Sequence, residues 1–244
     1  MRAFFAAVEF LTIVRVGRLS GSGEKWASGT LFWFPVVGLC LGWAAASLDH
    51  WLASLFPIPA RSALTLAALV VLTGGLHLDG LADTADGLFS FRGKESILEI
   101  MRDSRTGAMG VIAVSCLLII KFALIFSLPE GARRPAFLLM PLFGRAALVL
   151  MITFFPYARK EAGFATPFLE YRSKWYALWA AALSLLAGWL LYGAPGAVSA
   201  LAAGAAAGLA GLFFKEKIGG YTGDTLGASC ELIEIIPLLA AAAA

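Results

Sequence analysis

Charged residues are scarce in this chain. Asp, Glu, Lys and Arg make up 14% of its 244 residues, whereas soluble proteins average about 25%. The hydrophobic set accounts for 60% of the sequence. So little charge cannot cover the surface of a water-soluble domain, and much of the surface must therefore face the apolar solvent of a bilayer.

Cysteine is also rare. Cys40, Cys116 and Cys230 lie in or beside apolar segments without CxxC spacing, which excludes a disulfide framework and argues against a zinc site. The net charge is only +3, and no basic run carries interleaved aromatic residues. The sequence therefore gives no support to nucleic-acid binding.

Long apolar stretches predict an all-α protein, a polytopic transmembrane bundle that forms a single domain over residues 1–244. Six stretches approach the roughly 20 residues of a spanning helix. They lie near 30–53, 58–77, 108–128, 135–156, 174–193 and 195–214. The tail Leu232–Ala244 contains Glu234 and Pro237 and is either a seventh span or a segment packed against the others. Ala3–Val14 is too short to cross and contains Glu9, which favours an interfacial helix.

The basic residues give an orientation. If the six stretches all cross, the loops between them alternate between the two sides of the membrane. Arg61, Arg133 and Arg134 then lie on one side, and Lys121 and Arg145 lie inside spans. The other fourteen Lys and Arg residues are Arg2, Arg15, Arg18, Lys25, Arg92, Lys94, Arg102, Arg105, Arg159, Lys160, Arg172, Lys174, Lys215 and Lys217. That richer side should be cytoplasmic. The loops at 78–107 and 215–231 are then cytoplasmic and hold most of the acidic residues.

The segment His77–Gly87, HLDGLADTADG, is the strongest candidate site. Asp79, Asp83 and Asp86 follow i, i+4, i+7 spacing, which places three carboxylates on one face of a helix. They would repel one another unless a cation lay among them, and hard oxygen ligands suit Mg²⁺. A solvated helix N-terminus whose acids favour the helix dipole is the ordinary alternative. Three acids that continue an apolar span favour the metal.

Other residues in and after this segment are further candidates for the site. His77 is either a structural interfacial residue or a proton-transfer group. In Met101–Gly110, MRDSRTGAMG, Asp103 offers a fourth carboxylate ligand, and Arg102, Ser104 and Arg105 offer phosphate contacts. A basic flank of a membrane helix would also explain both arginines.

Gly219–Glu231, GGYTGDTLGASCE, is predicted to be a flexible loop. Its glycines and hydroxyls, with Thr222, could cradle a diphosphate, and Asp224 could be a further metal ligand or a ribose ligand. A glycine-rich linker between helices would look similar.

Charges and glycines inside the spans suggest further contacts. Within the spans, Arg145 could reach an anionic group of the substrate or neutralise Glu9, and Lys121 could pair internally. Phe34, Pro35 and Gly38 should kink or thin the first span, which would permit either close packing or a cavity entrance.

These motifs together resemble the cobalamin synthase family, the adenosylcobinamide-GDP ribazoletransferases. The resemblance rests on FLTIVRV near Phe10, FPVVG at 34–38, LHLDGLADTADGL at 76–88, IMRDSRTGAMG at 100–110 and GGYTGDTLGA at 219–228. They occur in the family's order over nearly the whole chain. FLTIVRV lacks the proline usual in the family, which puts only the local backbone in question.

The resemblance implies a magnesium-dependent transferase in the bacterial inner membrane that faces the cytoplasm. It would join adenosylcobinamide-GDP to α-ribazole or its 5′-phosphate and release GMP. Asp79, Asp83, Asp86 and Asp103 would hold one or two Mg²⁺ ions. His77 or one of these carboxylates, such as Asp83, would take the proton of the ribazole 5′-hydroxyl when α-ribazole is the acceptor. Arg102, Ser104, Arg105, Arg145, Thr222 and Asp224 would hold phosphate and nucleotide. A homo-oligomer is compatible with the sequence.

Two other functions use similar residues. A CDP-alcohol-type phosphotransferase also holds metal on spaced aspartates of a membrane helix, but its signature begins DGxxAR, and this chain has DGLADTAD. A secondary transporter could use Arg145, Lys121 and the acids to line a pathway. The acids, however, cluster at one face.

Overall fold

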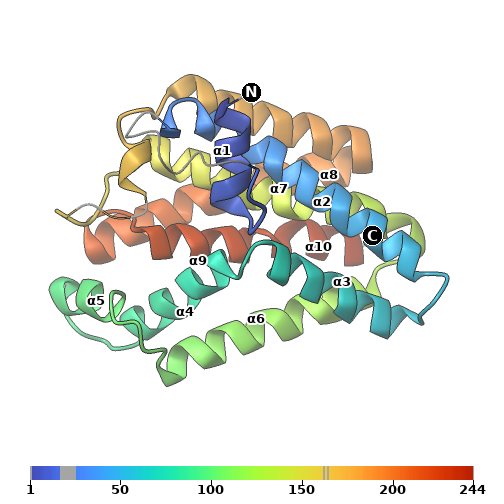
Figure 1. Ribbon diagram of the computed structural model, residues 1–244, viewed down its shortest axis with the longest axis horizontal. Coiled ribbons are helices and arrows are strands. Elements are labelled where there is room, and N and C mark those ends of the chain that lie inside the picture. Colours follow the sequence, from blue (N-terminus) through green and yellow to red (C-terminus); the bar gives the residue numbers. More distant parts are fainter. Residues whose placement is uncertain (1, 17–25, 162, 164, 244) are drawn as a thin grey trace.

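The computed structural model describes residues 2–16, 26–161, 163 and 165–243. Arg18, Lys25 and Ala244 of the preceding predictions lie outside these residues. The described chain is helical (Figure 1): α1 (Arg2–Leu11), α2 (Thr30–Leu52), α3 (Ile58–Leu72), α4 (Leu76–Leu88), α5 (Lys94–Ile100), α6 (Ala108–Ser127), α7 (Glu130–Phe154), the short 3₁₀ helix η3 (Thr166–Phe168), α8 (Lys174–Ile218), α9 (Gly223–Ile233) and α10 (Ile235–Ala242).

Several helices could cross a membrane. Within the described ranges, α2, α6, α7, α8 and the combined segment Gly223–Ala242 are long and apolar enough to span. The pair α3 and α4 passes the same test only when joined, and it is bent by 86°. The predicted all-α, multi-pass membrane architecture is confirmed, and α2 and α6 begin and end within one residue of the expected positions.

The helix α7 lies at the centre of the bundle, and α2 packs directly on it. A Cβ added at Gly38 would lie 2.5 Å from the carbonyl oxygen of Pro141, and one at Gly42 would lie 2.5 Å from that of Phe137. Only glycine lets two helix backbones approach so closely. The close packing predicted at Phe34–Gly38 is therefore confirmed, with Gly42 as a second contact.

The second span ends earlier than predicted. The helix α3 stops at Leu72 instead of continuing to His77, because Gly74 and Gly75 adopt φ angles of 61° and 67°. This left-handed backbone suits glycine and breaks the helix. The chain then turns into α4, which carries His77 and the three aspartates together.

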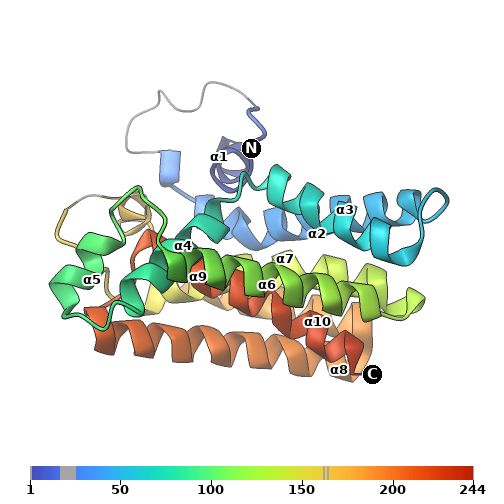
Figure 2. The same cartoon turned by 90° about the horizontal axis from the view of Figure 1, so that it is seen from below.

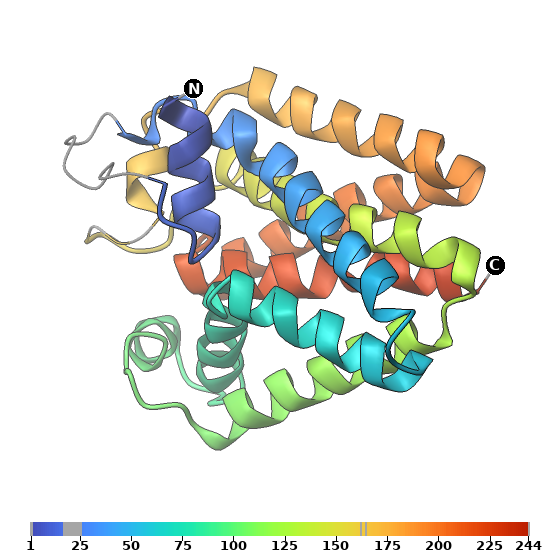
Figure 3. The same cartoon turned by 45° about the vertical axis from the view of Figure 1, so that its right-hand side comes forward.

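The helix α8 is a hairpin of two arms. A straight helix of its 45 residues would reach about 68 Å, more than twice the hydrocarbon thickness. Gly193, at φ 62° and ψ −144°, interrupts it. The backbones of Gly188 and Gly196 touch, and the two arms run side by side (Figure 3). The predicted spans 174–193 and 195–214 are confirmed, with the second arm extended to Ile218.

The prediction of a flexible loop at Gly219–Glu231 is wrong from Gly223 onward. Thr222 starts α9 with a capping box: its Oγ1 accepts from the Thr225 amide at 3.2 Å, and its own amide donates to Thr225 Oγ1 at 2.8 Å. Such reciprocal bonds fix a helix start. The described part of the predicted tail, from Leu232 to Ala242, is the second half of the apolar segment that α9 begins.

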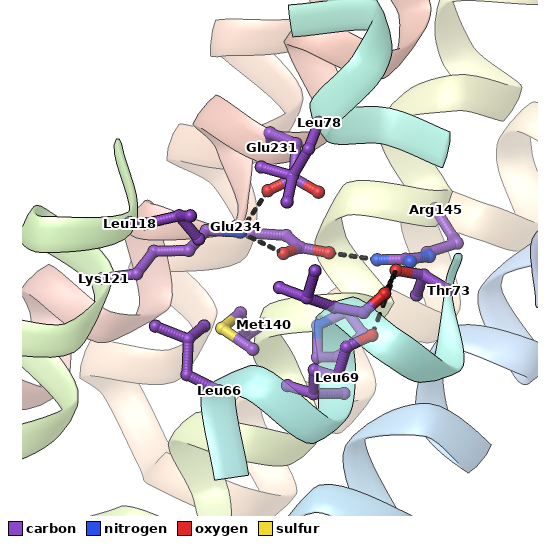
Figure 4. A pocket seen from close by; sticks show the side chains of 12 residues that line it. Leu66, Leu69, Thr73, Leu78, Leu118, Lys121, Met140, Arg145, Glu231 and Glu234 are labelled. Atoms are coloured by element: carbon purple, nitrogen blue, oxygen red, sulfur yellow. Dashed lines mark hydrogen bonds and ion pairs between the residues drawn. The ribbon is translucent and has the colours of Figure 1, made fainter. Parts of the chain in front are cut away.

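Two ion clusters are buried at different levels of the bundle. Lys121 Nζ lies 2.6 Å from Glu231 Oε2 and 2.5 Å from Glu234 Oε2, and Arg145 pairs with Glu234 (Figure 4). The internal pairing predicted for Lys121 is confirmed. Four charges of balanced sign join α6 and α7 to α9 and to its junction with α10.

The second cluster lies at the end of the bundle where α2 finishes and α7 begins. Arg133 is 2% exposed and binds both oxygens of Asp49, at 2.9 and 2.5 Å. Arg61 contacts Asp49 and Glu130. Arg61 and Arg133 thus lie inside helices rather than in loops.

Candidate active site

The helices α4 and α9 pack side by side at one end of the bundle (Figure 2). Two glycines make this possible. A Cβ at Gly80 would lie 2.7 Å from the carbonyl oxygen of Asp224, and one at Gly227 would lie 3.1 Å from the Cα of His77. The contact brings Asp224 beside the acidic segment of α4.

Asp224 enlarges the acidic face that the spacing predicted. Asp83 is partly buried, and its electrostatic neighbours include the carboxylates of Asp79, Asp224 and Asp86. Asp79 and Asp224 also line one cavity. Residues more than 130 positions apart in the sequence therefore supply one patch of negative charge, which favours binding of a cation.

Arg159 is the cation that the structure places against these acids, and sequence reasoning missed it. Its Nη2 lies 2.8 Å from Asp224 Oδ2. A backbone bridge positions it: the Tyr221 amide donates to Pro156 O at 2.9 Å, and the Ala158 amide donates to Tyr221 O at 2.8 Å. Arg159 follows a span on the basic side, so in sequence it looks like an ordinary helix flank.

Asp86 has a contact that its spacing did not predict. Its carboxylate accepts from the amide of Gly107 at 2.6 Å and from that of Gly110 at 2.9 Å. These amides open α6, where a negative charge satisfies unpaired donors and favours the helix dipole. Asp86 therefore ties α4 to the start of α6.

The segment Met101–Gly110 leads from α5 to α6, and its charges pair locally. Arg105 Nη2 donates to Asp103 Oδ2 at 2.6 Å. Hydrogen bonds from the Arg105 side chain and backbone lower the pKa of Asp103 to about 2, so it remains ionised at neutral pH. Arg102 pairs with Glu161, and Arg102, Ser104 and Arg105 are exposed. These side chains are open to an anionic ligand.

Thr222 and Arg145 lie behind the acidic face. Thr222 is fully buried, caps α9 and donates to Asp224 Oδ2 at 3.2 Å. Arg145 is 2% exposed and pairs with Glu234. In this conformation both side chains support α9 from inside the bundle.

A cavity of about 140 Å³, here called the aromatic cavity, opens beside the acids. Its polar wall includes His77, Asp79 and Asp224. His77 is 4% exposed, and its Nδ1 has no hydrogen-bond partner among the described residues. The rest of the wall is largely apolar, and its aromatic residues are Phe10, Phe34 and Phe168.

Known proteins match nearly the whole length of this chain. The family model described as cobalamin-5-phosphate synthase matches residues 3–242. The chain belongs to this family. Similar curated proteins are the adenosylcobinamide-GDP ribazoletransferases of Desulforamulus reducens, Acetivibrio thermocellus and Geotalea daltonii. Their identities are 41%, 38% and 35%. The matches cover 93%, 95% and 98% of this chain and 91%, 94% and 96% of those proteins. No solved structure matches the chain.

The acidic face of this cobalamin-5-phosphate synthase family member fits a metal shared with phosphate. In the described part of the chain, no three His, Cys, Asp or Glu side chains already surround one point closely enough to hold an ion. Mg²⁺ commonly takes only one or two protein carboxylates and completes its shell with water and substrate phosphates. Asp79, Asp83 and Asp224 supply hard oxygen ligands of that kind.

The contact of α4 with α9 can be tested through Gly80. Gly80→Ala adds a methyl group 2.7 Å from a backbone oxygen of α9, which must push the helices apart and lower stability by about 1–3 kcal/mol. Thermal unfolding in detergent measures the effect. Gly204→Ala on α8 is the matched control, since nothing lies within 4 Å of its added Cβ. Equal melting temperatures for both variants would show that the contact is looser than described.

Proposed function

We propose that this chain joins adenosylcobinamide-GDP to α-ribazole, or to its 5′-phosphate, and releases GMP. The products are adenosylcobalamin or its 5′-phosphate. The observation that supports this activity is the meeting of Asp79 and Asp83 of α4 with Asp224 of α9, beside Arg159. Such a face suits a diphosphate with its metal ion. The name that these relatives carry supplies the substrates.

The reaction exchanges a phosphoanhydride bond for a phosphodiester bond. A ribazole hydroxyl oxygen attacks the phosphorus on the cobinamide side of the diphosphate, and the bond from that phosphorus to the GMP oxygen breaks. The 5′-phosphorylated acceptor yields a product that keeps its 5′-phosphate. For that acceptor the attacking group must be a ribose ring hydroxyl, and we propose the same hydroxyl for α-ribazole in place of the 5′-hydroxyl expected from the sequence.

Asp83 is the residue we assign to accept the hydroxyl proton. It is partly exposed, and its burial together with the neighbouring carboxylates disfavours its charged form and favours uptake of a proton. His77 was the other candidate, but its ring is buried and the residue lines the aromatic cavity. Arg159 offers its guanidinium to the phosphates. Arg102 and Arg105, which are exposed between α5 and α6, offer theirs to the nucleotide.

Magnesium is the metal we propose, held by one or two of the carboxylates of Asp79, Asp83 and Asp224. When bound, it neutralises charge on the transferred phosphoryl group and on the departing GMP. Asp86 and Asp103, predicted as further ligands, already bind the α6 amides and Arg105, respectively. They are better suited to hold the surrounding segments in place.

We place the protein in the bacterial inner membrane with its active face in the cytoplasm. The acids lie at the end of the bundle that also carries the exposed Arg102 and Arg105 and both ends of α8, with Lys174, Lys215 and Lys217. At the opposite end, Arg61 and Arg133 are buried in ion pairs. This asymmetry of basic side chains favours the acidic end as cytoplasmic.

Purified protein in proteoliposomes should release GMP from adenosylcobinamide-GDP when α-ribazole and Mg²⁺ are present. Removal of divalent ions with EDTA should abolish release, and added Mg²⁺ should restore it, because carboxylates alone cannot neutralise the diphosphate. Chromatography of the nucleotide products measures both steps. Full activity in EDTA would refute the metal proposal. CMP release from a CDP-alcohol, or substrate flux without GMP release, would support the two competing functions instead.

A further inference from the structure

The aromatic cavity has a wall of three aromatic rings that come from distant parts of the chain. Phe10 and Phe34 stack at a centroid distance of 5.7 Å and an interplanar angle of 11°. Phe168 meets them edge-on, at 4.9 Å from Phe10 and 5.4 Å from Phe34. Rings in such arrangements form a rigid apolar surface. Phe34 and Phe168 are each only 1% exposed.

The lining of the cavity also includes polar residues. They are the buried His77, whose Nδ1 has no partner among the described residues, and Asp79 and Asp224. A buried polar atom without a hydrogen bond is costly, by about 1–3 kcal/mol. The cavity therefore combines an aromatic wall with a histidine whose ring nitrogen is unpaired and with two of the acids assigned to the reaction.

We infer that the aromatic cavity binds the base of α-ribazole. This inference rests on the proposed function, which supplies the nucleoside. The base is a planar benzimidazole with two methyl groups and one unsubstituted ring nitrogen. Its apolar faces match the phenylalanine wall, and its ring nitrogen accepts from His77 when Nδ1 carries the proton. The attached ribose then lies toward Asp79 and Asp224.

The other parts of the substrates fit this cavity less well. A volume of about 140 Å³ lies below the roughly 300–1,000 Å³ of pockets that enclose drug-sized ligands, so the corrin ring is excluded by size. Guanine presents several donors and acceptors on its edges. Most would face apolar side chains such as Leu148 and Ile152 and would lose hydrogen bonds to water.

The first test is a binding measurement that does not require turnover. Wild-type protein and the Phe168→Leu variant are titrated with α-ribazole, and binding is followed by fluorescence of the nucleoside. Loss of one aromatic surface should raise the dissociation constant about tenfold. Phe126→Leu is the control, because Phe126 is 46% exposed on α6 and lies outside the cavity.

The second test measures the proposed hydrogen bond from His77 by changing the ligand first, which leaves the protein unaltered. Wild-type protein should prefer α-ribazole about tenfold over the riboside of 5,6-dimethylindole, in which CH replaces the free ring nitrogen. His77→Leu should bind both nucleosides equally, and its KM for α-ribazole should rise while kcat changes little.

These measurements test the assignment of the cavity independently of the proposed reaction. If Phe168→Leu and His77→Leu left α-ribazole binding unchanged, or weakened only adenosylcobinamide-GDP, the base would lie elsewhere. If the two variants weakened α-ribazole binding and yet wild-type protein released no GMP, the cavity assignment would stand and the proposed reaction would fail.

Discussion

Asp83→Asn is expected to reduce GMP release by about 10²–10³-fold or more while the protein remains folded. Asparagine has nearly the same shape, but it cannot accept the hydroxyl proton or supply a negative ligand to the metal. It also removes repulsion between Asp83 and its neighbours Asp79 and Asp224. The melting temperature without metal should therefore stay the same or rise, which separates lost chemistry from lost structure.

Two variants complete this experiment. Asp79→Asn should also reduce turnover, because Asp79 belongs to the same acidic face. Glu216→Gln should leave turnover unchanged, since Glu216 is exposed near the end of α8. Near-normal GMP release by both Asp83→Asn and Asp79→Asn would refute the assignment of metal and proton transfer to α4.

Glu234→Ala is expected to cause the largest loss of stability, about 3–5 kcal/mol, by leaving buried positive charge uncompensated. Glu234 is 4% exposed and pairs with both Lys121 and Arg145. After its removal, Glu231 remains for Lys121, but Arg145 loses the carboxylate that it contacts. Unfolding in mixed micelles with increasing denaturing detergent measures the change.

The double variant Arg145→Met/Glu234→Met supplies the matching control. It removes one charge of each sign and leaves the pair of Lys121 with Glu231 intact. Because replacement of a buried ion pair by apolar residues is often neutral or stabilising, the double variant should recover most of the lost stability. A double variant as unstable as Glu234→Ala would indicate that packing volume, and not charge, holds this junction together.

Hydropathy and charge counts predict most of the fold because the bilayer imposes helix length and side on the sequence. The spans at Thr30–Leu52 and Ala108–Ser127 begin and end almost where expected. The turn after α3 was missed because Gly74 and Gly75 lie inside an apolar run, where composition alone does not reveal a positive φ. The start of α9 was missed because glycines and hydroxyls suit loops and helix caps equally.

The acidic face was predicted only in part, because contacts between distant segments leave little trace in a single sequence. Spacing on one helix identified Asp79, Asp83 and Asp86. It could not reveal that α9 would bring Asp224 beside them, or that Asp86 would bind amides of α6. Arg159 carries no distinguishing signal, since a basic residue after a span is the general rule.

The buried cluster at Glu234 also bears on how the chain enters the membrane. Lys121 and Arg145 belong to α6 and α7, whereas Glu231 and Glu234 come from the last apolar segment of the chain. During synthesis the two cations precede their counter-ions by the whole length of the α8 hairpin. Charges in the bilayer interior are unfavourable until they are paired. Arrival of the final segment therefore neutralises the bundle and, in the same step, delivers Asp224 to the acids of α4.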